Sequence, residues 1–410
     1  MSADAVAAYR VYLGISFALA ATTGLVYTTV VVYRVDAAGL NPLQLVLVGT
    51  VLEAAYFGFQ LPTGVLADLG SSRACVVFGV AVLGAGLLVE GAWPTFAGIL
   101  AAQVVGALGY ALVSGALEAW IAGEVGTGDL TRVYLRGSQA GLAGTLLGTA
   151  ASGPVAGGRL NLPLLTGGAL LLATAAVLVV VMPERARTRP DSEPGAVETV
   201  RAAWRLIRVR PAFVLVFVVV ALVGGWSEAI DRLWGAHLLA NHRLPGPDAT
   251  LWFSLLGVVA TLLGLVVTQV LATRTAETLR TLLAIVAALL GTTIVFGLAT
   301  NVWVAIGAAL ALAAARTAFA PVLSAWLVER TDPGVRATVL STRDMFDATG
   351  QVLGGPALGA IGTWWSLRAA LLAGASALAP AAVLLITARR RLRAATAPGT
   401  TTAPRPESTR

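Results

Sequence analysis

Long apolar stretches, separated by short polar ones, recur along the whole chain. Each has about 20 residues, the length that an α-helix needs to cross the hydrocarbon core of a bilayer. The strict alternation of a membrane β-barrel is absent, so we predict an all-α integral membrane protein with twelve spanning helices. They cover approximately residues 9–33, 43–66, 74–92, 95–122, 133–158, 162–182, 211–236, 249–273, 279–299, 302–327, 336–361 and 366–388.

One connection is long and polar, and it divides the predicted helices into two groups of six. From 196 to 208 this connection places apolar side chains on one helical face and arginines on the other, which predicts an amphipathic helix at the membrane surface. The Ala/Thr/Pro-rich end of the chain has too little apolar surface to fold. The expected domains are a six-helix bundle over 1–182, a linker over 183–210, a second six-helix bundle over 211–388 and a disordered tail over 389–410.

Composition and charge agree with a membrane protein. Of the 410 residues, 57% are hydrophobic and only 12% are charged, with a mean hydropathy of +0.82, whereas soluble domains carry about 25% charged residues. All 28 basic residues are arginine; seven lie between Arg185 and Arg210, and four between Arg389 and Arg393. Because cytoplasmic segments are enriched in basic residues, both termini are predicted to be cytoplasmic in a multi-pass protein of the inner or plasma membrane.

The chemistry-bearing residues argue against several functions. The chain has one cysteine, Cys75, and two histidines, too few for an intrachain disulfide or a typical metal-ligand spacing. A phosphate-binding Gly-x-x-x-x-Gly-Lys loop is absent from the sequence. We therefore expect no enzyme, no ATP, no metal and no cofactor. The isoelectric point near 10.3 follows from the arginines at helix ends, so we expect no nucleic-acid partner.

An internal repeat relates the two groups of helices. Residues 114–120 (Ser-Gly-Ala-Leu-Glu-Ala-Trp) parallel residues 320–326 (Ala-Pro-Val-Leu-Ser-Ala-Trp). Residues 153–158 and 355–360 share the pattern Gly-Pro-x-x-Gly-small. Repeated helical bundles of this kind are common in secondary transporters, so the repeat favours a transporter architecture over an unspecified helical membrane protein.

The segment between the second and third predicted helices resembles the loop signature of the major facilitator superfamily. Gly64, Asp68 and Gly70 match that signature, and Arg73 keeps one of its basic groups, whereas Leu69 stands where an arginine is usual. The glycines allow a tight turn. The resemblance implies that Asp68 meets the positive N-terminus of the eleventh helix when the cytoplasmic gate is closed, with a weaker charge interaction because an arginine is missing.

A second motif lies in the fifth predicted helix. Gly153, Pro154, Gly157 and Gly158 resemble the Gly-Pro-x-x-Gly-Gly core of the antiporter signature of the same superfamily. Small residues allow close helix contacts and proline bends a helix, so a purely structural bend is the alternative interpretation. The resemblance implies export in exchange for protons.

Further stretches resemble a narrower branch, the tetracycline-resistance and macrolide-efflux drug:proton antiporters. They are residues 42–49, 114–120, 227–237 and 336–341, in both halves of the chain. Gln103 stands where many superfamily members carry an arginine, so a proton-coupling step assigned to that arginine does not transfer. The resemblance implies two six-helix pseudo-repeats. The partners it implies are a small-molecule substrate, protons and the lipid bilayer, with the protein acting as a monomer.

Charged residues inside the predicted helices are the candidate proton and substrate sites, because charge in hydrocarbon is costly and marks function. At 1.5 Å per residue, Glu53 lies about 15 Å from the outer end of its helix, Asp347 about 17 Å from the inner end, and Arg316 about 21 Å along. Burial favours the protonated form of a carboxyl group, so Glu53 and Asp347 compete for the role of proton carrier. The alternative for Asp347 is that it neutralises Arg316, or Arg343 at i, i+4.

The seventh predicted helix holds a second charged cluster. Glu228 and Arg232 share a face at i, i+4, and Asp231 lies between them in sequence. Asp231 falls about 30 Å along the helix, near the outer surface. The cluster is expected to be an outer gate or a substrate entry site, or else a salt-bridged helix end. His237 beyond it is expected to be an interfacial residue.

Two further sets complete the candidate residues. Glu118, near the inner end of the fourth predicted helix, and Arg136, at the start of the fifth, are expected to pair as part of the gate. Aromatic rings offer broad contact for an amphipathic drug cavity, although each alone also suits packing or an interfacial belt. The candidate aromatic residues are Tyr27, Tyr56, Phe57, Trp226 and Trp234.

The sequence thus predicts a secondary active transporter that exports amphipathic, antibiotic-like small molecules in exchange for protons by alternating access. An uptake symporter for a small nutrient is the first alternative. A non-transporting membrane sensor is the second.

Overall fold

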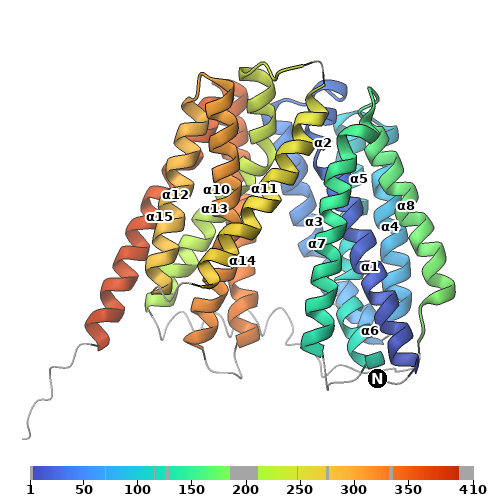
Figure 1. Cartoon of the computed structure of the whole chain (residues 1–410). Coiled ribbons are helices and arrows are strands. Elements are labelled where there is room, and N and C mark those ends of the chain that lie inside the picture. Colours follow the sequence, from blue (N-terminus) through green and yellow to red (C-terminus); the bar gives the residue numbers. More distant parts are fainter. Residues whose placement is uncertain are drawn as a thin grey trace, which may run out of the picture.

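Helices make up all the regular structure that can be described in this chain. The computed structural model describes residues 3–69, 71–114, 116–125, 130–184, 211–246, 248–273, 277–331 and 336–396. In these residues the helices form twelve long rods packed side by side (Figure 1). The all-α class and the twelve predicted helical segments are confirmed.

The first six rods form the N-terminal half, and two of them are interrupted. The first breaks at Thr28–Thr29, and the fourth breaks after Val113, where the sequence pattern predicts continuous helices. The elements are α1 (Ala3–Tyr27) followed by α2 (Val30–Val32) and the π-helix η1 (Tyr33–Ala37), α3 (Pro42–Leu69), α4 (Ser72–Ala92), α5 (Phe96–Val113) followed by α6 (Ala116–Val125), α7 (Leu130–Ala156) and α8 (Leu162–Val181).

The other six rods form the C-terminal half, and each is a single helix. Two of them outlast the predicted spans by five residues or more, the first ending at Asn241 and the last at Thr396, because their ends continue the helix beyond the apolar run. The elements of this half are α10 (Pro211–Asn241), α11 (Ala249–Ala272), α12 (Thr278–Leu298), α13 (Val302–Glu329), α14 (Arg336–Trp364) and α15 (Leu367–Thr396).

Short polar residues set several helix starts. The side chains of Ser71, Thr95, Asp248 and Asn301 each accept a hydrogen bond from a backbone N–H in the first turn of α4, α5, α11 and α13. Each bond satisfies one of the donors that a helix N-terminus leaves without an intrahelical partner. These caps place the turns between rods where the apolar runs end.

The predicted start of the tail and the predicted start of the loop after the second helix need correction. The predicted linker lies almost entirely outside the described residues. The tail predicted to be disordered from 389 continues α15 as helix to Thr396, where Arg389 and Arg393 bind Glu277. Residues 64–69, predicted to begin the inter-helix loop, belong to α3. The predicted linker and its amphipathic helix lie outside the described residues except for 183–184.

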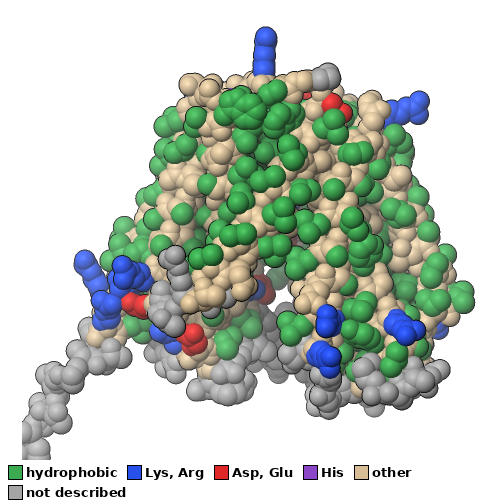
Figure 2. Space-filling model, in the orientation of Figure 1, with side chains coloured by type: hydrophobic (Ala, Val, Ile, Leu, Met, Phe, Trp, Pro, Cys, Tyr) green, Lys and Arg blue, Asp and Glu red, His purple; other side chains and the backbone are tan. Residues whose placement is uncertain are grey.

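Both ends of the described chain lie on one face of the bundle (Figure 1). We call this the terminal face and the other the opposite face. The buried apolar residues form two clusters. One fills the C-terminal half and continues into the N-terminal half through residues such as Val26, Val46 and Leu164. The second, around Tyr12, Val76 and Trp120, belongs to the N-terminal half alone. Figure 2 shows a hollow between the halves on the terminal side.

Glycines let the two halves approach closely near the opposite face. A Cβ added to Gly359 of α14 would lie 3.0 Å from the Val46 side chain of α3. The Leu43 backbone N–H donates to Thr363 Oγ1 (2.8 Å), and the Gly153 N–H of α7 donates to Ser254 Oγ of α11 (2.6 Å). These contacts close the bundle at the opposite face, whereas the described residues leave the hollow of Figure 2 between the halves on the terminal side.

The Gly-Pro repeat adopts two different conformations. In α7 the helix ends at Ala156, and Gly157 and Gly158 follow with φ values of +44° and +81°, a region that glycine enters without a Cβ penalty. In α14 the corresponding residues 359–360 are helical, and the helix continues to Trp364. An alanine at 360 disfavours the left-handed turn. This accounts for the continuation of α14 beyond its Gly-Pro motif, where α7 ends.

Ten of the twelve rods are long and apolar enough to cross a membrane, judged on the described residues. The exceptions are α7 and α14, which carry more polar residues. Both lie at the boundary between the halves, where α7 packs on α11 and α14 packs on α3. Their polarity therefore fits helices that face another part of the protein instead of lipid.

Candidate functional site

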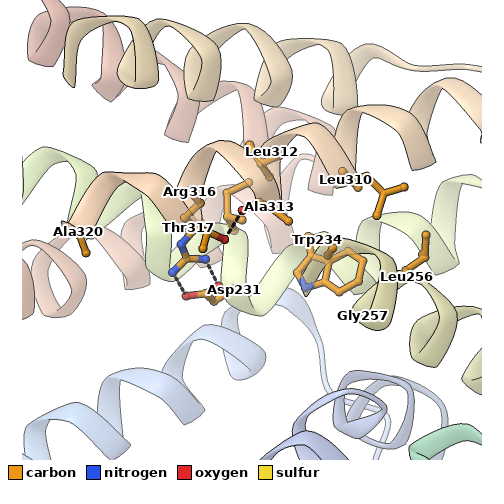
Figure 3. Close-up of a pocket in the computed structure, with 13 residues that line it drawn as sticks. Asp231, Trp234, Leu256, Gly257, Leu310, Leu312, Ala313, Arg316, Thr317 and Ala320 are labelled. Atoms are coloured by element: carbon orange, nitrogen blue, oxygen red, sulfur yellow. Dashed lines mark hydrogen bonds and ion pairs between the residues drawn. The ribbon is translucent and has the colours of Figure 1, made fainter. Parts of the chain in front are cut away.

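A cavity of about 470 Å³ opens in the C-terminal half between α10, α11 and α13 (Figure 3). Its size and its mainly apolar wall, with a few polar groups, are typical of small-molecule sites. Gly257 on its wall also approaches Thr149 of α7, so the cavity lies beside the boundary between the halves. The principal lining residues are Ile230, Asp231, Trp234, Leu256, Leu310, Leu312, Arg316 and Thr317.

An ion pair between Asp231 and Arg316 forms the polar side of this cavity. Both terminal nitrogens of the Arg316 guanidinium donate to the two carboxylate oxygens of Asp231, as Figure 3 shows. Such two-fold pairing fixes orientation as well as charge. The prediction that Asp231 lies near the outer surface is wrong: α10 continues ten residues further, to Asn241, which leaves Asp231 about 15 Å inside the helix end.

A second ion pair lies deeper on the same helix. Arg232 Nε donates to Glu228 Oε1 (3.0 Å), and the Glu228 side chain is only 2% exposed. Gly49 of α3 lies directly against it, since a Cβ at position 49 would be 1.8 Å from Glu228 Oε1. The predicted i, i+4 pair is therefore present, and it forms part of the contact between the halves.

Two acids of the region between α3, α10, α13 and α14, which we call the central region, make no ion pair among the described residues. Glu53 of α3 is half-buried, makes neither a hydrogen bond nor an ion pair there, and interacts electrostatically with Glu228, Arg232 and Asp347. Asp347 of α14 accepts one hydrogen bond, from Gln351 Nε2 (2.8 Å). These two carboxyl groups are the ones in the central region that remain available for a proton or a cation.

The interpretation of Asp347 as the partner of Arg343 or Arg316 is not what the structure shows. Arg343 pairs with its neighbour Asp344 (2.5 Å) and donates to Ser324 Oγ (2.6 Å), and Arg316 pairs with Asp231. The guanidinium groups that spacing alone assigned to Asp347 are thus occupied by nearer carboxylates.

A buried charged network in the N-terminal half was missing from the sequence prediction. Arg34 and Gln103 both donate to the Glu90 carboxylate, each at 2.8 Å, and the Tyr33 hydroxyl donates to the Glu90 carbonyl (2.5 Å). Arg34 and Glu90 are 4% and 3% exposed at their side chains. An acid within the apolar run of α4 is the same signal that singled out Glu53, and it was sufficient to find Glu90.

The predicted gate residues are only partly described. The side chains of 64–70, Asp68 included, lie outside the described set, while Arg73 donates to the Val179 carbonyl of α8. The predicted pair of Glu118 and Arg136 is not formed: Arg136 donates instead to Gln139 Oε1 (3.1 Å), which lies three residues further along α7.

The candidate aromatic residues occupy three kinds of environment. Trp234 lines the cavity. Trp226 is 1% exposed and donates to Thr293 Oγ1 (3.2 Å), so its assignment to a drug cavity is wrong because it packs in the helix core. Tyr27 and Phe57 are 47% and 54% exposed, and Tyr56 belongs to a polar cluster on α3 and α5.

Comparison with known proteins supports the fold. No protein-family model and no curated protein sequence matches the chain. Among solved structures, the nucleoside transporter NupG is 13% identical, with a TM-score of 0.77 over 93% of this chain and 99% of that one. A bacterial homologue of the human lysosomal transporter Spinster, inward-facing and occupied, is 16% identical, with a TM-score of 0.76 over 95% and 99%.

A third similar structure is a POT family transporter in complex with a thioalcohol-conjugated peptide. It is 13% identical, with a TM-score of 0.71 over 93% of this chain and 96% of that one. At such low identity these similarities establish the architecture alone. The chain has the twelve-helix major facilitator fold.

Proposed function

We propose that the protein is a secondary active transporter that exports amphipathic small molecules in exchange for protons. The observation that carries the proposal is a pair of carboxyl groups, Glu53 and Asp347, that make no ion pair among the described residues, in a protein with a mainly apolar cavity beside the boundary between two helical bundles. Each structural neighbour named above is a transporter. The resemblance of Gly153-Pro154 and its flanking glycines to the antiporter signature supports the direction.

The hollow between the halves, toward the terminal face, supports alternating access. If that face is cytoplasmic, as the arginine distribution predicts, the structure is an inward-facing state in which a substrate enters from the cytoplasm. Protonation of Glu53 or Asp347 favours one facing state and substrate favours the other, so that coupling is a shift of populations. A proton moving inward down 100 mV supplies about 2.3 kcal/mol, which supports about fiftyfold accumulation of an exported neutral molecule.

The test is transport into inverted membrane vesicles, whose cytoplasmic face is outside. An acidic interior is expected to drive uptake of an amphipathic fluorescent dye, and collapse of the pH gradient to stop it. Glu53→Gln and Asp347→Asn are expected to reduce gradient-driven uptake at least tenfold. Glu329→Gln, an exposed acid paired with Arg330 on the terminal side of α13, is the matched control and keeps full uptake.

The same vesicles separate the alternatives. An uptake symporter moves its substrate with the protons, so an acidic interior would expel the substrate instead of accumulating it. A non-transporting sensor shows no gradient-dependent flux, and its thermal stability with dyes is unchanged by Glu53→Gln and Asp347→Asn. Either result contradicts proton-coupled export.

A further inference from the structure

Two tyrosine rings and their polar neighbours form a cluster in the N-terminal half that neither the motifs nor the cavity accounts for. Tyr56 of α3 and Tyr110 of α5 have ring centroids 5.0 Å apart, inclined at 54°. The Tyr56 hydroxyl donates to Ser114 Oγ (3.3 Å) and accepts from Gln60 Nε2 (3.0 Å). The Tyr56 ring is therefore held in place, whereas Tyr110 is 57% exposed.

This cluster borders the space between the halves. Helix α3 packs against α5 in its own half and against α10 and α14 of the other half. Glu53 lies one turn before Tyr56 on α3, and the Tyr110 phenol interacts electrostatically with Glu53. Hydroxyl and amide groups gathered at membrane depth are disfavoured against lipid, which favours an orientation of the exposed Tyr110 ring toward the space between the halves.

Charges around the cluster leave an excess of acid. Among the described residues of the central region, the three guanidinium groups each pair with one carboxylate: Arg232 with Glu228, Arg316 with Asp231 and Arg343 with Asp344. Glu53 and Asp347 remain without such a partner. The faces of aromatic rings are electron-rich and attract cations. The tyrosine rings and the Glu53 carboxylate therefore both favour a positively charged ligand.

We propose that Tyr56, Tyr110 and Glu53 form a subsite that binds an organic ammonium group, with the rings contacting the cation and Glu53 balancing its charge. The inference rests on the proposed function and names the substrate class for it: an amphipathic amine or quaternary ammonium compound. The apolar remainder of the substrate would reach across to the cavity of the C-terminal half. A neutral planar ring that merely stacks on the tyrosines is the competing occupant.

The test uses two probes of the same shape on the purified full-length protein in lipid nanodiscs. One is (naphthylmethyl)trimethylammonium; the other is its neutral isostere, in which carbon replaces the ammonium nitrogen. Titration calorimetry measures both. We expect the cation to bind at least about tenfold more tightly, the ratio that a desolvated cation–π contact provides.

Variants then locate the preference. Tyr110→Leu is expected to lower cation affinity about tenfold, while Tyr110→Phe, which keeps the ring, retains most of it. Glu53→Gln should reduce the preference for the cation without weakening binding of the isostere. Phe78→Leu, which removes an exposed ring of α4 outside the cluster, is the matched control and leaves both affinities unchanged.

The outcomes distinguish this inference from the proposed function. Equal affinity for cation and isostere, or a cation preference that survives Tyr110→Leu and Glu53→Gln, would overturn the ammonium subsite even if vesicles still export dye. Conversely, a tyrosine-dependent cation preference in a protein that moves no dye would support the subsite and refute export.

Discussion

Asp231 on α10 and Arg316 on α13 bind each other through two parallel N–H···O hydrogen bonds, although 42% and 36% of their side-chain surfaces remain exposed. The pair connects two helices of the C-terminal half and at the same time presents charge to the cavity. A substrate with a charged group therefore meets a partner that is already engaged.

The strength of this pair is measurable by a double-mutant cycle. Asp231→Ala leaves Arg316 without its carboxylate, and Arg316→Ala does the reverse. We expect a coupling of about 0.5–1 kcal/mol, the upper part of the range for exposed ion pairs, because more than a third of each side chain remains exposed. In thermal unfolding in detergent, the double variant should therefore lose less stability than the sum of the losses of the two single variants. Strictly additive losses would show that the two side chains stabilise the protein independently.

Gly49 is predicted to destabilise the protein when it is replaced by alanine. A Cβ there would lie 1.8 Å from Glu228 Oε1 and 2.3 Å from Arg232 Nε, so Gly49→Ala must displace the buried ion pair and loosen the contact between the halves. We expect a cost of about 1–3 kcal/mol, measured as a lower melting temperature. Gly58→Ala on the same helix, where a Cβ would meet nothing within 4 Å, is the control. Equal melting of both variants contradicts the packing argument.

The network of Arg34, Glu90 and Gln103 makes a sharper prediction. Glu90→Gln keeps the shape of the side chain but leaves Arg34 as an uncompensated buried charge, which costs about 3–5 kcal/mol. Replacing both charged residues, Arg34→Met with Glu90→Leu, removes that penalty. Thermal unfolding should rank the double variant above Glu90→Gln alone. The reverse order would mean that Arg34 reaches water without Glu90.

Glu277 provides the pH dependence that can be tested outside the membrane-spanning segments. Its carboxylate accepts hydrogen bonds from Arg389 (2.7 Å) and Arg393 (2.8 Å), which lower its pKa from 4.5 to about 2. A depressed pKa means that the stabilisation is fully present above about pH 4.5 and is lost as pH falls toward 2.

The corresponding measurement compares the wild type with Glu277→Gln. The difference in melting temperature is expected to be constant between pH 8 and pH 5.5 and to shrink below pH 4.5. Because the pair is exposed, high salt should reduce the difference. A difference that instead grows on acidification would show that the carboxylate is not held ionised by the two arginines.

The apolar pattern was sufficient for the twelve helices, because a membrane requires each spanning segment to satisfy its own backbone within a narrow range of lengths. It could not predict the break at Thr28–Thr29. There Thr29 hydrogen-bonds Ser152 of α7 (2.9 Å), and Ser152 donates to the Leu25 carbonyl (2.6 Å). Such a break depends on a neighbouring helix that the local sequence does not specify.

The ion pairs of the site also differ in how far the sequence could predict them. Glu228 and Arg232 pair within one helix, so their spacing was enough to predict the contact. Asp231 and Arg316 are 85 residues apart. In addition, the sequence offered both Arg316 and Arg343 as partners for Asp347. Partner choice between helices depends on rotation and depth, which a single sequence leaves open. Glu90, in contrast, could have been predicted, because it is an acidic residue within the apolar run of α4.

The low hydropathy of α7 and α14 has a consequence for how the protein is made. A helix is released into lipid according to its own transfer free energy, and these two are the described rods that fall short of the others. Each is followed at once by an apolar helix that it contacts, α8 and α15 respectively. We expect α7 and α14 to enter the bilayer as hairpins with those partners, so that the helices bordering the central space are also the last of each half to become stable in the membrane.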